Sequence, residues 1–124
     1  MSDIIIDGDT LVEVKRSQAD VLKIPPTVKH IGRKAMYDCQ ASMYLIPDTV
    51  ESIGSGAFSS SGVTKIQIPD SVKTVGTALF LMCDYLREAE LGTGIKTLTK
   101  NMFAFCDSEV KILIDGVIDS IDDT

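Results

Sequence analysis

The sequence lacks any long run of apolar residues. Its apolar stretches are only a few residues long, whereas a membrane-spanning helix needs about 18 or more in succession. The first residues, Met1–Asp7, contain neither the basic segment nor the long apolar segment of a secretory signal peptide. These absences predict a protein with no membrane span and no export signal, so we expect a cytoplasmic or virion-associated protein rather than a secreted one.

Basic residues and histidine are also scarce. The chain has 12 Lys and Arg against 18 Asp and Glu, which gives a net charge of −6. Because a chain of this sign repels a phosphate backbone, we expect no nucleic-acid partner. His30 is the one histidine, with no serine or cysteine partner evident in the sequence, so we expect no catalytic base. A zinc site needs about four clustered donors, so we expect no metal and no other cofactor.

Only three cysteines are present in 124 residues. A chain of this length that is 44% hydrophobic buries roughly two-thirds of its unfolded surface as one domain, and it needs no disulfides to do so. The sequence therefore predicts one domain held together by its apolar core.

What the chain does have is an internal repeat of 22 residues. Ile24–Pro25 returns as Ile46–Pro47 and again as Ile68–Pro69, each time followed by a Val-x-x-Ile/Val-Gly pattern. A fourth copy with one inserted residue contains Leu91, and a truncated fifth contains Ile114. Because each unit is too short to bury its own apolar face, a repeat of this length predicts a solenoid.

Each unit predicts two short strands and one helical or 3₁₀ turn. The Ile-x-Ile alternation is typical of a strand buried on one face, and the proline ends that strand because it has no N–H to donate. The glycine after the second strand indicates a positive φ or a close approach to a neighbour. Apolar groups at positions i, i+1 and i+4, such as Leu79, Phe80 and Cys83, then lie on one side of a helical turn. Coils spaced about 4.8 Å apart would make a rod only about 20 to 25 Å long.

The two ends of the array differ. The segment Ile4–Val14 predicts a β-hairpin around Asp7–Gly8, so we divide the single domain into an N-terminal hairpin cap, 1–20, and about 4.5 repeats of 22–23 residues, 21–124. At the other end, only acidic side chains discourage pairing of the last strand edge. We therefore hypothesise self-association through the C-terminal coil, or stacking of that coil on a partner.

The complete unit resembles that of the BspA-like leucine-rich repeats, L-x-x-I-x-I-P-x-x-V-x-x-I-G-x-x-A-F-x-x-C. The copy that fits it most fully contains Ile66, Ile68, Pro69, Val72, Val75, Gly76, Phe80 and Cys83. The resemblance implies an α/β solenoid, a short right-handed leucine-rich-repeat coil with parallel sheets of short strands. It also implies protein binding, often on microbial surfaces and in host adhesion. The family offers no catalytic residues, so we do not expect an enzyme.

The three cysteines share one position of the repeat. Cys39, Cys83 and Cys106 occupy it, and Ser61 holds it in the remaining copy. The repetition favours a buried column of small side chains. A redox pair between Cys83 and Cys106, which adjacent coils would bring together, is the alternative.

The candidate binding surface is the row of residues that point outward from the first strand of each unit. Met43 and Leu45, beside Tyr44, form an apolar spot within a charged row, as protein-binding patches do. Scattered surface apolar residues without a function are the alternative interpretation. The candidate residues are Lys23, Met43, Leu45, Lys65, Gln67, Glu88, Glu90 and Leu113.

These patterns predict a non-catalytic module that binds another protein, in interaction or adhesion, through an exposed sheet face. The second hypothesis is a structural assembly subunit, of a virion or a surface structure, that packs through its ends. No residue is predicted to be catalytic, to bind a cofactor or to bind a metal.

Overall fold

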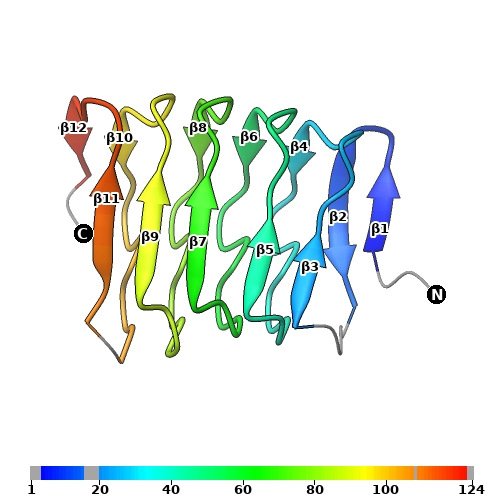
Figure 1. Ribbon diagram of the computed structural model, residues 1–124, viewed down its shortest axis with the longest axis horizontal. Helices are drawn as coiled ribbons and strands as arrows, with labels where there is room; N and C mark the ends of the chain where they lie inside the picture. The colour runs from blue at the N-terminus through cyan, green and yellow to red at the C-terminus, as the bar shows by residue number, and fades with distance from the viewer. Residues whose placement is uncertain (1–3, 16–19, 108, 123–124) are drawn as a thin grey trace.

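The computed structural model describes residues 4–15, 20–107 and 109–122, and within them the chain forms twelve short strands and no helix (Figure 1). The strands are β1 (Ile4–Asp7), β2 (Thr10–Val14), β3 (Val21–Lys23), β4 (His30–Ile31), β5 (Met43–Leu45), β6 (Ser52–Ile53), β7 (Lys65–Ile68), β8 (Thr74–Val75), β9 (Glu88–Leu91), β10 (Thr97–Leu98), β11 (Lys111–Ile114) and β12 (Ser120–Ile121). The chain winds through them as a stack of coils, so the predicted solenoid is confirmed.

Two layers of strands make up the stack. The longer strands form one parallel sheet in the order β11-β9-β7-β5-β3, which lies in front in Figure 1. The shorter strands lie behind, where β4, β6 and β8 follow the longer β2 in one parallel series and β10 pairs separately with β12. Registers such as Met43 with Lys65 and Lys65 with Glu88 follow the repeat. Equivalent positions of successive coils therefore lie side by side.

The first coil is preceded by an antiparallel hairpin of β1 and β2. Its two-residue turn is Gly8–Asp9, one residue later than the Asp7–Gly8 pair suggested, and Gly8 has a φ of 63°. Strand β2 also pairs in parallel with β4. The hairpin thus extends the sheet of shorter strands by one strand.

The segments predicted as helical or 3₁₀ turns are not helices, so the α/β part of the prediction is wrong. Alternate N–H groups there donate to the next coil, as Met36 does to the Ala57 carbonyl at 2.7 Å. The intervening ones close tight turns, as Tyr37 does to the Lys34 carbonyl at 3.1 Å. Lys34 has a left-handed φ of 55°, which a continuing right-handed helix does not allow. The apolar spacing was correct. It does not show, however, that half of the N–H groups donate to carbonyls of a neighbouring coil instead of to carbonyls of their own turn.

A glycine follows each of β4, β6 and β8, and it allows close approach between coils. A Cβ atom placed on Gly54 would lie 2.6 Å from the backbone nitrogen of Arg33 in the preceding coil. Its N–H donates to the Ile31 carbonyl at 2.7 Å, so the two coils touch backbone to backbone. Of the two reasons that the sequence suggested for this glycine, contact between coils is the one that applies.

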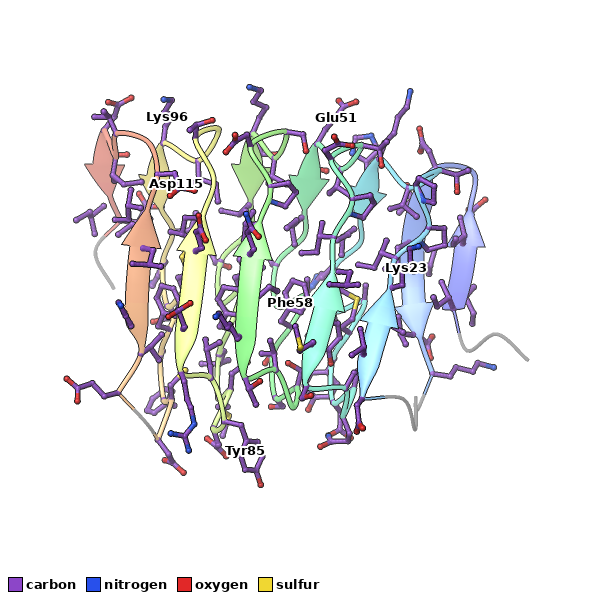
Figure 2. All side chains as sticks on the ribbon, in the orientation of Figure 1. Lys23, Glu51, Phe58, Tyr85, Lys96 and Asp115 are labelled. Carbon is purple, nitrogen blue, oxygen red and sulfur yellow. The ribbon has the colours of Figure 1, made fainter. Side chains whose placement is uncertain are left out.

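Aromatic rings form a continuous stack inside the molecule. Ring centroids are 5.3 Å apart for Tyr44 and Phe58, 5.5 Å for Phe58 and Phe80, and 5.4 Å for Phe80 and Phe103. Phe58 lies midway along the stack and is fully buried (Figure 2). The Tyr44 hydroxyl donates to the Cys39 carbonyl at 3.1 Å, and burial raises the pKa of Tyr44. Each coil is thereby joined to the next through its largest side chains.

The cysteine position forms a second column. Cys39, Ser61 and Cys83 are buried, whereas Cys106 is half-buried, and all three thiols are free. The Cys83 thiol donates to the Phe58 carbonyl at 2.9 Å, and burial raises its pKa to about 11. A buried thiol that is kept protonated in this way is a poor nucleophile. The column therefore contributes packing and hydrogen bonds, and the alternative redox pair is not formed.

We predict that Phe58→Ala destabilises the fold by about 3 to 5 kcal/mol, because it opens a cavity between two stacked rings. Phe105→Ala is the matched control, since Phe105 is 78% exposed, and it should change the free energy of unfolding by no more than about 0.5 kcal/mol. Urea unfolding of both variants provides the measurement. Equal losses would show that the ring stack does not hold the coils together.

Candidate protein-binding face

The outward residues of the longer strands form two columns. Register pairs Val21 with Met43, Met43 with Lys65, and Lys65 with Glu88 in the first column. The second column consists of Lys23, Leu45, Gln67, Glu90 and Leu113. All eight predicted residues lie on this face: Glu88, Glu90 and Leu113 are half-buried, and the others are exposed. The alternation of a strand buried on one face thus placed each of them correctly.

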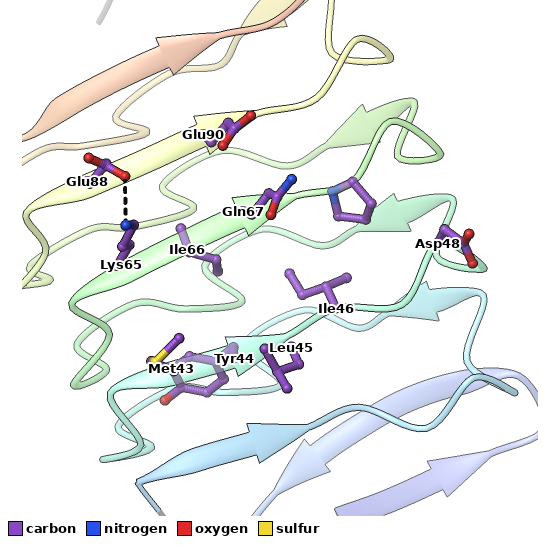
Figure 3. A pocket seen from close by; sticks show the side chains of 11 residues that line it. Met43, Tyr44, Leu45, Ile46, Asp48, Lys65, Ile66, Gln67, Glu88 and Glu90 are labelled. Atoms are coloured by element: carbon purple, nitrogen blue, oxygen red, sulfur yellow. Dashed lines mark ion pairs between the residues drawn. The ribbon is translucent and has the colours of Figure 1, made fainter.

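A hollow of about 580 Å³ lies in the middle of this face, over β5, β7 and β9 (Figure 3). It brings together six of the predicted residues, namely Met43, Leu45, Lys65, Gln67, Glu88 and Glu90. Lys23 and Leu113 lie on the flanking strands β3 and β11 and do not line it. Sequence reasoning missed Ile46, Asp48 and Pro69, which line the hollow from the corner after each strand. Strand alternation does not encode corner geometry, so no sequence pattern pointed to these three residues.

The hollow has an apolar side. Met43 and Leu45 on β5 are 42% and 47% exposed, and Val21 on β3 is 46% exposed. Val21 was missed, although it precedes Lys23 by two residues, as Met43 precedes Leu45. We call Val21, Met43 and Leu45 the apolar strip. Three exposed apolar side chains on two neighbouring strands form a surface that releases water when it is covered.

The other side of the hollow is charged. Lys65 Nζ lies 3.4 Å from Glu88 Oε2, the ion pair drawn in Figure 3. Glu90 lies next to the carboxyl group of Asp115, which raises the pKa of Glu90 by hydrogen bonding and by charge repulsion. The negative charges of Glu88 and Asp70 add to this shift. We call Glu90 and Asp115 the carboxylate pair.

His30 does have a serine partner, contrary to the sequence analysis. Its Nδ1 lies 2.7 Å from Ser52 Oγ, because the repeat places these residues opposite each other on β4 and β6. At the same position of later repeats, Thr97 Oγ1 on β10 lies 2.9 Å from Ser120 Oγ on β12. The His30 contact is therefore one rung of a side-chain ladder that links coils. Neither His30 nor Ser52 lines the hollow described above.

The described residues were also predicted to hold no metal ion and to form no membrane span. Among the residues that the structure describes, no three His, Cys, Asp or Glu side chains are grouped so that they could hold a metal ion. None of the described segments is a helix that could span a bilayer.

The fold and this face define a leucine-rich-repeat solenoid. The chain belongs to the BspA-type leucine-rich repeat family, whose model matches residues 15–124 with six copies. The resemblance of the repeat unit to that family is thus confirmed. No curated protein matches the chain significantly.

Two solved structures share the fold. A leucine-rich repeat protein from Eubacterium ventriosum superposes with a TM-score of 0.76 at 20% identity, over 91% of this chain and 33% of that one. The pneumococcal vaccine antigen PcpA superposes with a TM-score of 0.67 at 19% identity, over 98% of this chain and 38% of that one. The present chain thus spans between a third and two-fifths of the length of these neighbours. At such identities the likeness concerns the fold.

We predict that Asp115→Asn slightly raises the melting temperature at pH 7. Because Asp115 raises the pKa of Glu90, the folded protein binds protons more tightly than the unfolded chain between the two Glu90 pKa values. The contribution of Glu90 to stability therefore falls as the pH rises through that window, and removing the neighbouring charge restores it.

Thermal melts at pH 3, 5 and 7 provide the measurement, with Asp122→Asn as a control for the loss of one exposed carboxylate. The gain should disappear at pH 3, where Glu90, whose pKa is raised, is protonated and uncharged. A gain of equal size at pH 3 would contradict repulsion within the pair.

Proposed function

We propose that this chain is a non-catalytic module that binds another protein through the outward face of β3, β5, β7, β9 and β11. The apolar strip carries the proposal, because its three side chains are exposed and two of them, Met43 and Leu45, line a hollow that is also lined by charged groups. Interfaces commonly combine an apolar centre with a polar rim. The backbone beneath the face is fixed by hydrogen bonds to both neighbouring coils, so little conformational entropy is lost on binding.

The experiment compares capture by the wild-type protein with capture by Leu45→Asp. Leu45 is 47% exposed at one end of the apolar strip, next to the hollow, so a carboxylate there should repel an apolar partner without unfolding the solenoid. The control is Val12→Asp, because Val12 is 44% exposed on β2, in the other sheet. We expect a partner captured by the wild type and by Val12→Asp to be lost with Leu45→Asp. Retention of the same partner by Leu45→Asp would refute the proposal.

A second candidate function, structural assembly through the ends of the rod, is favoured by the last coil. Ile112 and Ile114 are 38% and 44% exposed, whereas Ala89 and Leu91, at the same positions one coil earlier, are fully buried. Ile121 on β12 is 68% exposed. Strands β11 and β12 are also terminal in their sheets, so each has one unpaired edge. In this version, another coil covers the apolar end and pairs with those edges.

Ile114→Asp separates assembly from face binding. If the C-terminal coil mediates assembly, light scattering at high protein concentration should give a mass above the monomer for the wild type and for Leu45→Asp, and a monomer for Ile114→Asp. Burying a charge in an otherwise apolar contact is strongly unfavourable, which gives the expected direction. A monomeric wild type at all concentrations would exclude self-assembly through the C-terminal coil.

A further inference from the structure

The binding face has two chemically different ends. The apolar strip lies on β3 and β5. Of the carboxylate pair, Glu90 lies on β9 and Asp115 directly follows β11. Leu45 and Glu90 are two strands apart, and neighbouring strands are about 4.8 Å apart, so these two centres are separated by about 10 Å across the sheet. The hollow connects them without interruption, since both residues line it. A single ligand can therefore contact both ends.

The charged end is short of positive charge. Lys65 forms an ion pair with Glu88. Among the described residues, no Lys or Arg forms an ion pair with Glu90 or Asp115, and Asp70 adds a third negative charge in their vicinity. The Asp115 N–H donates to the Leu91 carbonyl at 3.0 Å, which holds Asp115 beside Glu90, so the two carboxylates repel each other. A cation placed between Glu90 and Asp115 would relieve this repulsion.

The shape of the face favours a narrow ligand. Five strands span about 20 Å, and four residues of strand extend about 13 Å, so the face is longer across the strands than along them. An extended segment that lies across the strands therefore follows the longer dimension of the face.

We infer that the face recognises an extended segment of a partner protein in which an apolar side chain covers the apolar strip and a Lys or Arg, about three residues away, lies at the carboxylate pair. This inference rests on the proposed function and specifies the partner's chemistry. The spacing follows from the 10 Å separation, because residues i and i+3 of a polyproline II segment point the same way about 9 Å apart. The long side chains of Lys and Arg tolerate neighbouring spacings as well.

The test uses synthetic nine-residue peptides as probes, titrated by NMR into ¹⁵N-labelled protein. The parent peptide carries Leu and Lys three residues apart in a background of Pro and Ser. One variant replaces Leu by Ser and another replaces Lys by Glu. We expect the parent to shift the amide resonances of β5, β7 and β9, and each replacement to weaken binding by about five- to tenfold.

Protein variants locate the contact. Glu90→Gln removes one charge of the carboxylate pair and should weaken the parent peptide about three- to fivefold, an effect that shrinks as salt is added. Glu51→Gln is the matched control, because Glu51 is an exposed glutamate beside β6, in the other sheet, and it should have no effect. Asp115→Asn should weaken binding in the same way although it raises the melting temperature, which a merely structural role would not produce.

The inference is overturned if the Glu peptide binds as well as the Lys peptide, if Glu90→Gln and Glu51→Gln behave alike, or if no peptide binds. If any of these occurs while Leu45→Asp still loses a captured partner, the proposed function stands and the partner's chemistry is different. If Leu45→Asp retains that partner, the proposed function fails as well. The two failures are thus distinguishable.

Discussion

Hydrogen bonds between the backbones of successive coils are the constraint on which this structure depends. The Phe58 N–H donates to the Leu79 carbonyl one coil later, and the Gly76 N–H to the Ile53 carbonyl one coil earlier. Because the bonds occur on every side, each coil must keep the same path as its neighbours. The two extra residues of the last coils fall in the segments between Cys83 and Ala89 and between Cys106 and Ile112. Each bond contributes about 1 kcal/mol, so the stack gains stability by repetition.

This constraint explains how much of the fold could be predicted. The period of 22 residues indicated coils, and alternation around Ile24, Ile46 and Ile68 indicated which side chains face inward. The turns were predicted wrongly, because apolar spacing in Leu79–Cys83 is the same for a helical turn and for a ladder between coils. Only the positions of neighbouring chains decide between the two, and one unit of sequence does not contain them.

The candidate face was predicted only in part. Its strand residues were predicted, whereas its corner residues and the pairings between coils were missed. The eight predicted residues of the face, from Lys23 on β3 to Leu113 on β11, were found because strand alternation determines which residues face outward. Pairings between coils were harder to see: His30 meets Ser52 only because the register places them opposite each other. The hollow adds Pro69 from a corner, and Asp115 acts on Glu90 from the following coil. Because outward positions are free of the packing constraint, they can vary from coil to coil, and that variation gives the face an apolar end and an acidic end.

Amide hydrogen exchange of the turn segments tests the central claim most directly. If the coils are joined by backbone bonds on every side, the amides of Met36, Phe58 and Phe80 should exchange as slowly as those of β7, because each donates to the next coil. The Tyr37 amide, which closes only a local turn, should exchange faster. If Phe58 and Phe80 exchanged as fast as Tyr37, the turn side would not be a ladder, and the account of the stack given above would be wrong.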